Sequence, residues 1–299
     1  MGAWFYIFVL IIKSAIGGIS NGFIKQYQKT APAGNAAYCL FSLIMSLCAM
    51  TFFFITGGFR LEVNSPTILY SIVAGLDTVI VVILGVVAMK YIDLITLSFS
   101  QSCGSMIIPV LFGILFLNER TTLLFWVSAA LMASAVLLPI AAKGKPKERG
   151  TVIGYICCAV LFFMNGMYVV LLKLFQSSPI VTNENAYCFL MNLVMFFVSA
   201  AGFLVLSKRQ SSIKTELKKI TPKHIAYVAA SAVTSNASTL LAFVVMGGMS
   251  IALMTILGTS LGILITAFLS VVVFKERKLH LVDVISILCA IASVVVGAL

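Results

Sequence analysis

The sequence contains few charged residues for its length. Of its 299 residues 10% are charged, with nine Asp and Glu against 20 Lys and Arg, whereas about a quarter of the residues in an ordinary soluble domain are charged. This supply is too small to cover the surface of a water-soluble protein of this size. A soluble globular fold is therefore excluded, and membrane lipid would take the place of a polar surface.

The groups that most enzymes and metal sites need are also scarce. The two histidines, His224 and His280, fall at the ends of apolar segments, and no Ser-His-Asp, Cys-His or paired-carboxylate arrangement accompanies them. The seven cysteines all lie within apolar segments, without a C-x-x-C motif or a histidine at metal-ligand spacing. We therefore expect no enzyme, no metal site and no cofactor.

Long apolar runs are what the sequence has instead. Hydrophobic residues make up 61% of the chain, with a mean hydropathy of +1.13. A membrane-spanning helix needs about 20 mostly apolar residues. By that measure the sequence predicts an all-α integral membrane protein with ten transmembrane helices, at residues 3–25, 35–57, 67–89, 94–116, 122–142, 151–173, 185–207, 224–247, 250–273 and 280–299. Because Lys13 interrupts the first run, that run does not resemble a cleaved signal peptide.

The chain contains an internal repeat. Leu117-Asn118-Glu119-Arg120 returns 157 residues later as Phe274-Lys275-Glu276-Arg277. The same offset pairs Tyr70 with Tyr227, Leu84 with Leu241, Met89 with Met246, Leu131 with Leu288 and Ala133 with Ala290. The sequence therefore predicts two five-helix repeats, at 1–142 and 151–299, joined by a connecting loop at 143–150.

An odd number of helices in each repeat makes the second copy enter the membrane from the opposite side. The two halves would then be related by a pseudo-two-fold axis in the membrane plane, as in many carriers. Two such halves can rock around a central site and open it to either side in turn. A duplicated helical bundle with no transport role is the structural alternative.

The basic residues indicate an orientation. All but four of the 20 Lys and Arg residues lie in or beside loops that follow the odd-numbered spans, the four being Lys13, Arg60, Arg120 and Lys173. The positive-inside rule would make those loops cytoplasmic and would place both termini outside. Anionic headgroups and this topology explain the excess of basic residues, so we expect no nucleic-acid partner.

Two charged residues lie near the middle of expected spans. Lys13 is about ten residues into the span 3–25 and Asp77 about ten into the span 67–89, and a charge at that depth costs about 2.5–3.5 kcal/mol on insertion scales. Both spans enter from the same side, so the two charges would share one depth. Lys13 would hold a carboxylate or phosphate, while Asp77 would balance it or take up a coupling proton. A structural ion pair, or two charges that never meet, are the alternatives.

Uncharged polar residues add to this expected site. Four side chains in the span 94–116 fall on one helical face, while several asparagines bring amides into other spans. Together with the two charges, the expected substrate-binding set is Lys13, Asn21, Asp77, Ser98, Gln101, Ser102, Asn165 and Asn236. Each hydroxyl alone is a weak signal, because hydroxyls often bond carbonyl groups of their own helix. In the span 250–273 we favour packing of small residues over a polar wall.

The spans 122–142 and 280–299 have almost no interior polar groups apart from serines and Asp283 near an end. We expect these two helices to face membrane lipid or a partner subunit. A homodimer would form through them.

The pattern resembles the EamA-type members of the drug/metabolite transporter superfamily. Ten spans, a 5+5 inverted duplication and a Glu-Arg pair at 119–120 and 276–277 carry the resemblance, together with Pro109 before the run Phe112–Arg120. It covers the whole chain, although the second copy has Thr266 in place of the proline. The resemblance implies a central cavity lined by the first four helices of each repeat. It also implies cytoplasmic termini, which disagrees with the charge pattern.

Relatives in that superfamily move amino acids, other small metabolites, nucleotide sugars or organic cations. Small multidrug relatives place an acid in the first helix, where this sequence has Lys13. The sequence therefore favours a secondary-active transporter of a small polar metabolite, anionic or zwitterionic and amino-acid-like, in the plasma membrane of a bacterial cell. A multidrug or organic-cation exporter, and a membrane sensor or structural protein that does not transport, are the alternatives.

Overall fold

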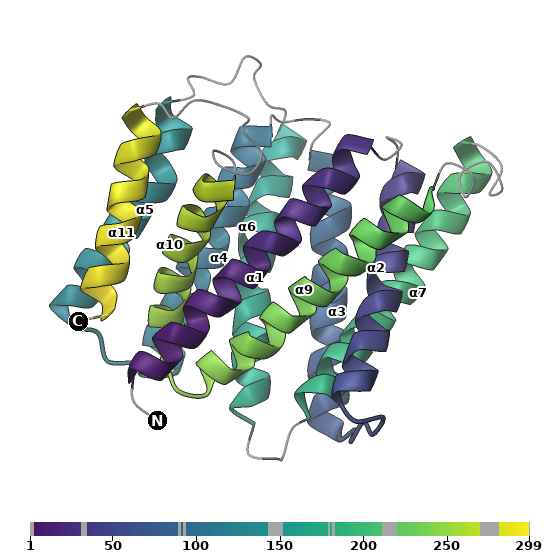
Figure 1. Cartoon of the computed structure of the whole chain (residues 1–299), viewed down its shortest axis with the longest axis horizontal. Helices are drawn as coiled ribbons and strands as arrows, with labels where there is room; N and C mark the ends of the chain where they lie inside the picture. Colours follow the sequence, from purple (N-terminus) through teal and green to yellow (C-terminus); the bar gives the residue numbers. More distant parts are fainter. Residues whose placement is uncertain are drawn as a thin grey trace. The chain divides into compact units, whose positions relative to one another are not determined.

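The structure of the chain is a computed structural model that describes residues 3–30, 35–88, 91, 94–142, 152–178, 180, 183–210, 220–269 and 281–298. The described residues form ten α-helices and no strand (Figure 1). Their bounds are α1 Ala3–Thr30, α2 Asn35–Thr56, α3 Ser65–Ala88, α4 Leu94–Phe116, α5 Leu123–Ala142, α6 Val152–Gln176, α7 Glu184–Gln210, α9 Pro222–Met246, α10 Ile251–Phe268 and α11 Leu281–Ala298. Each helix coincides with one expected span, with ends that differ by at most five residues.

Seven of these helices are long and apolar enough to cross a membrane. They contain the stretches Trp4–Tyr27, Ala37–Thr56, Ser65–Gly85, Val152–Gln176, Glu184–Ser207, Pro222–Met246 and Leu281–Ala298. Shorter apolar stretches lie in α4, α5 and α10. The chain is therefore an all-α, multi-pass membrane protein by length and composition, while ten crossings and the inverted repeat stay predictions.

Five of the ten described helices begin where a side-chain oxygen accepts a hydrogen bond from a backbone N–H of the first turn. Such a cap satisfies a donor that has no partner within the helix. The oxygens and their donors are Asn64 for Thr67, Thr122 for Phe125, Asn183 for Ala186, Thr221 for His224 and Ser250 for Leu253. These caps fix the starts of α3, α5, α7, α9 and α10.

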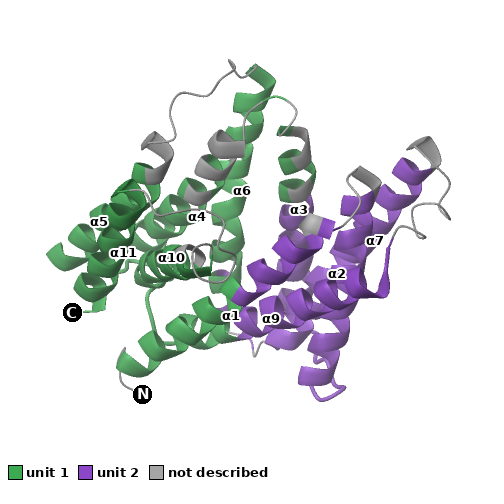
Figure 2. Cartoon of the chain, turned by 45° about the horizontal axis from the view of Figure 1, so that its top comes forward, with its two compact units in different colours: residues 1–18, 80–173, 241–299 green, residues 19–79, 174–240 purple. Residues whose placement is uncertain are grey.

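The chain folds into two compact units, each drawn in one colour in Figure 2. Unit 1 contains residues 1–18, 80–173 and 241–299, and unit 2 contains residues 19–79 and 174–240. Several helices contribute residues to both units, so the units do not coincide with the two sequence repeats. Each unit is instead assembled from residues of both halves of the sequence.

Unit 2 is built around the packing of α2 against α7. The hydroxyl groups of Ser42 and Ser199 lie 2.8 Å apart across this contact. The segment of α3 in this unit also packs on α7, because a Cβ added at Gly75 would lie 2.8 Å from the Cβ of Val194, and Ser71 donates a hydrogen bond of 3.0 Å to the carbonyl oxygen of Tyr187. Small residues therefore permit close helix approach in unit 2.

Unit 1 contains a buried cluster of serines between α5, α10 and α11. The Ser128 hydroxyl donates to the Ser293 carbonyl oxygen at 2.8 Å, and the Ser293 hydroxyl donates to the Ser128 carbonyl oxygen at 2.9 Å. Ser260 of α10 donates to the Ser293 hydroxyl at 3.0 Å. All three serines are fully buried, so these hydroxyls join the three helices inside an apolar environment.

A second contact fixes the register of α5 against α11. Ser286 donates a hydrogen bond to the carbonyl oxygen of Ala135. Ala135 lies seven residues after Ser128 on α5, whereas Ser286 lies seven residues before Ser293 on α11. The helices are antiparallel. The centre of this pairing lies at Met132 and Cys289, which are separated by the 157 residues of the sequence repeat.

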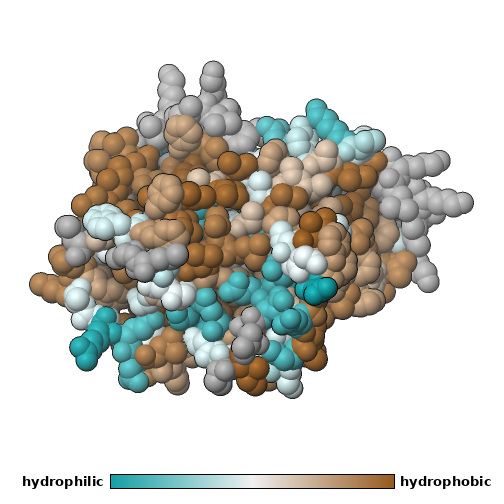
Figure 3. All heavy atoms as spheres, turned by 60° about the horizontal axis from the view of Figure 1, so that its bottom comes forward, coloured by the Kyte–Doolittle hydropathy of each residue, from teal (hydrophilic) through white to brown (hydrophobic). Residues whose placement is uncertain are grey.

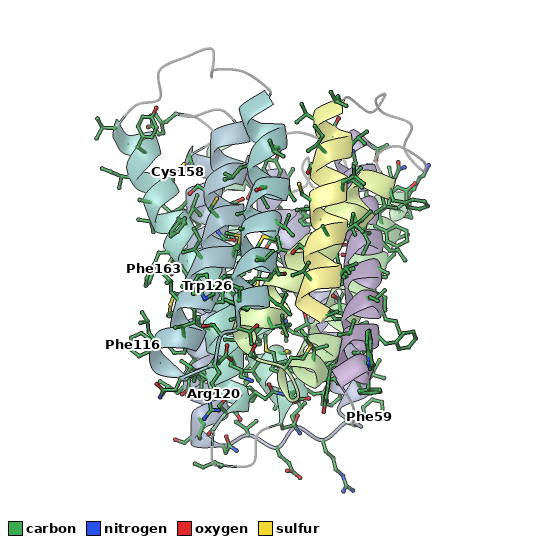
Figure 4. The ribbon with its side chains drawn as sticks, turned by 90° about the vertical axis from the view of Figure 1, so that its left-hand side faces the viewer. Phe59, Phe116, Arg120, Trp126, Cys158 and Phe163 are labelled. Atoms are coloured by element: carbon green, nitrogen blue, oxygen red, sulfur yellow. The ribbon has the colours of Figure 1, made fainter. Side chains whose placement is uncertain are left out.

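The mutual packing of α5 and α11 leaves their outer faces apolar and exposed. Among the exposed side chains are Trp126 of α5 and Leu288 of α11. Phe116 and Phe163, on neighbouring helices of unit 1, are also exposed (Figure 4). Apolar residues cover most of the face shown in Figure 3, and polar residues gather in its lower part and in a smaller area at its upper right edge. Contact of α5 and α11 with lipid or with a partner subunit therefore stays a prediction, and it would involve only the outer faces of these helices.

We expect Ser293→Ala to lower the free energy of unfolding by about 1 kcal/mol, because one hydroxyl takes part in hydrogen bonds to two other helices. Thermal unfolding of the detergent-solubilised protein measures the effect. Ser134→Ala is the matched control, since the Ser134 hydroxyl bonds the Ala130 carbonyl oxygen of its own helix. Equal melting temperatures for the two variants would show that the serine cluster does not hold unit 1 together.

Candidate substrate-binding site

Five of the eight expected site residues belong to unit 1 and three to unit 2. Unit 1 contains Lys13, Ser98, Gln101, Ser102 and Asn165. Unit 2 contains Asn21, Asp77 and Asn236. The pairing of Lys13 with Asp77 therefore stays a prediction, since the two residues belong to different units.

Lys13 of α1 can be placed along α10 through glycine contacts. A Cβ added at Gly258 would lie 3.7 Å from Leu10, and one added at Gly18 would overlap Ile265. The helices α1 and α10 thus run side by side in the same direction. Lys13 is three residues beyond Leu10, so it lies beside α10 near Leu261.

Gln101 of α4 lies at about the same level. The end of α4 meets the start of α10, because a Cβ added at Gly113 would lie 2.8 Å from a methyl carbon of Ile251. Because α4 and α10 are antiparallel, the residue ten positions after Ile251 on α10, Leu261, lies opposite the residue ten positions before Gly113 on α4, Cys103. Unit 1 therefore brings Lys13 and Gln101 to nearly one level, within one helical turn of each other along the helix axes.

The Gln101 side chain is half-buried and extends towards α3. If a Cβ were added at the buried Gly85, the one atom of the described residues within 4 Å of it would be the Gln101 amide nitrogen, at 4.0 Å. The absence of a side chain at Gly85 leaves room beside this amide. A carboxamide at that level could donate a hydrogen bond to a ligand carboxylate held by Lys13.

The contact between α4 and α6 sets the position of Asn165. A Cβ added at Gly104 would overlap the Phe162 carbonyl oxygen, and one added at Gly166 would overlap Ile108. The two helices therefore run in the same direction, in very close contact. In this register Asn165 lies about six residues along the axis from Gln101, or about 9 Å.

Two of the three expected asparagines bond a carbonyl oxygen of their own helix. The amide nitrogen of Asn165 donates to the Leu161 carbonyl oxygen at 2.8 Å, and that of Asn236 to the Ala232 carbonyl oxygen at 2.6 Å. Asn192 bonds its own helix in the same way. Asn21 is exposed. Each bonded amide satisfies one of its two N–H donors within its own helix, which leaves the second N–H and the carbonyl oxygen as the groups that could meet a ligand.

Asp77 of α3 is the most deeply buried acid in the described part of the chain, with 3% of its surface exposed. Neither carboxylate oxygen has a hydrogen-bond partner among the described residues. Asp77 follows Gly75 by two residues, or about 200° around the helix, so its side chain points away from the α7 contact made by Gly75. A buried acid without hydrogen bonds is costly as a carboxylate.

The side chains of Ser98 and Ser102 lie outside the described residues. Ser100, which lies between them and was not expected to take part, is buried and donates to the Cys158 carbonyl oxygen of α6. In α10, the hydroxyls of Thr255 and Thr259 bond carbonyl oxygens of their own helix. Together with Ser260, they support packing in α10, and the side chain of Thr266 is not described.

Within the described residues, no group of three or more His, Cys, Asp or Glu side chains could hold a metal ion. The seven cysteines are free thiols. The candidate groups that unit 1 brings near one level are the cation Lys13 on α1 and the carboxamide Gln101 on α4.

Comparisons with known proteins show the fold and no more. No protein-family model and no curated protein matches the sequence. Among 28 solved chains that match in structure, one described as "Crystal structure of protein" covers 98% of this chain and 95% of its own length, with a TM-score of 0.73 and 15% sequence identity. The fold thus occurs in solved proteins, and membership of the EamA-type transporters stays a prediction.

Proposed function

We propose that the protein is a secondary-active transporter of a small anionic or zwitterionic metabolite, related to the EamA-type carriers and working by alternating access without a cofactor. The observation that carries this proposal is the antiparallel packing of α5 on α11. Its register is centred on Met132 and Cys289, two positions that the sequence repeat makes equivalent. Antiparallel contact between equivalent helices supports two inverted halves, which is the architecture of carriers.

Further contacts support the same relation. The helices α2 and α7 are equivalents in the repeat, as are α4 and α10, and both pairs pack together within their units. The end of α4 meets the start of α10, so this pair is also antiparallel. On this account all ten helices cross the membrane, including α4, α5 and α10, whose apolar stretches are shorter.

The chemistry of the site favours a substrate with a carboxylate. Lys13 supplies a positive charge and Gln101 supplies amide donors at the same level of unit 1. A lysine ammonium binds a carboxylate as a point charge, and the amide fixes its orientation. An amino acid or a similar metabolite would satisfy both groups, whereas a cationic drug would be repelled by Lys13.

We expect Lys13→Ala to abolish exchange of labelled amino acids or carboxylates in liposomes, because the cation that holds the substrate is lost. The folded protein should remain in the membrane, as size-exclusion elution and thermal unfolding would show. Lys25→Ala, at the far end of the same helix, is the control and should retain exchange. Exchange at the parent rate by Lys13→Ala would refute the assignment of this lysine to the site.

Asp77 has a separate expected role as the carrier of a coupling proton. We expect Asp77→Asn to retain exchange of substrate across the liposome membrane but to lose accumulation driven by a pH gradient, since an amide cannot release a proton. Uptake with and without the gradient measures the difference. Gradient-driven accumulation that survives in Asp77→Asn would contradict this role. If Asp77→Asn instead lost transport of organic cations while Lys13→Ala kept it, the result would favour the alternative of an organic-cation exporter.

A further inference from the structure

The Glu119 carboxylate binds the first turn of α10. One oxygen accepts a hydrogen bond from the Ile251 N–H at 2.6 Å, and the other accepts one from the Ala252 N–H at 3.1 Å. These donors have no partner within α10, and the positive end of the helix dipole lies at the same place. A side chain that follows α4 therefore caps a helix that begins 132 residues later.

Local geometry in unit 1 delivers Glu119 to this position. After α4 ends at Phe116, Asn118 adopts a left-handed backbone conformation with φ of 52°, which asparagine tolerates better than most residues. The Glu119 N–H then bonds the Gly113 carbonyl oxygen at 3.0 Å. A Cβ at Gly113 would overlap a Glu119 carboxylate oxygen, so a larger residue there would displace this carboxylate.

Lys173 binds the other side of the same turn. Its ammonium donates to the carbonyl oxygen of Met246, the last residue of α9, at 2.6 Å, and more weakly to that of Met249 at 3.5 Å. A cation at a helix C-terminus is favoured for the same reason that a carboxylate is favoured at an N-terminus. Opposite charges thus satisfy the two helix ends that meet at residues 247–250.

Tyr6 of α1 completes the contacts with the turn. Its ring lies directly against Gly248, where any Cβ would overlap it. We call Tyr6, Glu119 and Lys173, together with residues 246–252, the turn clamp. The clamp joins the ends of α1, α4, α6, α9 and α10. Three of these helices carry the unit 1 site residues Lys13, Gln101 and Asn165.

The clamp lies on one side of this site, towards the chain termini. Tyr6 precedes Lys13 by seven residues on α1, or about 10 Å along the axis. The C-terminal end of α11 is at the same end of unit 1, because a Cβ at Gly297 would lie 2.8 Å from the Ser128 hydroxyl near the start of α5. A ligand at Lys13 could leave towards that end after these helix ends separate.

We propose that the turn clamp is a gate, which holds unit 1 closed at the end where the chain termini lie and is released when the carrier opens there. This inference rests on the proposed transport function. Glu119 and Lys173 are positioning residues in it, and neither binds the substrate. Because the held groups are backbone N–H and C=O groups at helix ends, release of the clamp leaves α9 and α10 intact.

A cysteine at position 258 reports on the gate. A side chain there makes ordinary contact with Leu10, one turn before Lys13, so Gly258→Cys should be accepted in a variant whose seven native cysteines are replaced. A membrane-impermeant maleimide is applied to intact cells and to inverted vesicles. We expect Glu119→Gln and Lys173→Gln each to raise the labelling rate about tenfold from the side of the termini, the change that loss of a charge-assisted hydrogen bond would produce.

Arg120→Gln is the matched control. Arg120 follows Glu119 in the repeated motif but is exposed at the end of α4 (Figure 4), so its variant should be labelled at the parent rate. Unchanged labelling in both Glu119→Gln and Lys173→Gln would overturn the gate, and so would an equal rise from both sides, which would indicate general loosening. If one variant fails to fold, the other decides between these results.

Labelling requires no substrate, so it separates the gate from the transport function. A side-specific rise in labelling, without exchange of any metabolite by the parent protein, would support the gate contacts and overturn the proposed function. Exchange by the parent protein, with labelling unaffected by either substitution, would overturn the gate and leave transport standing.

Discussion

The structure depends on the absence of water around most of its backbone. In a lipid interior each N–H and C=O group must be satisfied within the protein, which makes the helix the only open-chain solution. The groups that still need hydrogen-bond partners are the backbone groups at the helix ends and the polar side chains. Here asparagine and hydroxyl side chains bond carbonyl oxygens of their own or neighbouring helices, and Glu119 and Lys173 satisfy the ends of α10 and α9.

Close helix contact is the second consequence of this environment. Without a strong hydrophobic drive between helices in lipid, packing and interhelical hydrogen bonds hold them together. Gly104 and Gly166 bring α4 against α6, and the buried serines join α5, α10 and α11. Other contacts, at Gly18, Gly113 and Gly258, place Lys13 and Gln101 near one level of unit 1. Packing of small residues is therefore what builds the candidate site.

The helices could be predicted from sequence because each depends on a local run of about 20 apolar residues. The hydrogen-bond partners of side chains could not be predicted, because they depend on contacts between positions that are distant in the sequence. The placement of Glu119 at a helix end followed from its position after an apolar run, but its bond to the start of α10 required the tertiary register. In the sequence, Lys173 is one of four basic residues that do not lie in or beside the loops after the odd-numbered spans. Its position at the end of an expected span was the one available signal.

The site itself was predictable in part. Lys13 and Asp77 stand out in the sequence because charges are rare in apolar helices. Asp77 is buried in the structure, and the role of both residues in a site stays a prediction. Asn165 and Asn236 bond their own helices, which composition cannot distinguish from ligand binding. Small residues were noted as packing signals for the span 250–273, whereas the closer contact of α4 with α6, at Gly104 and Gly166, was not expected.

The central claim is that two five-helix halves enter the membrane from opposite sides. Reporter fusions test it most directly: a phosphatase that is active outside the cell and a fluorescent protein that matures inside, each placed in the connecting loop 143–150 and at the C-terminus. Five crossings between the two positions predict that they report opposite sides of the membrane. Reports from the same side would mean an even number of crossings in the second half, and would contradict the inverted repeat.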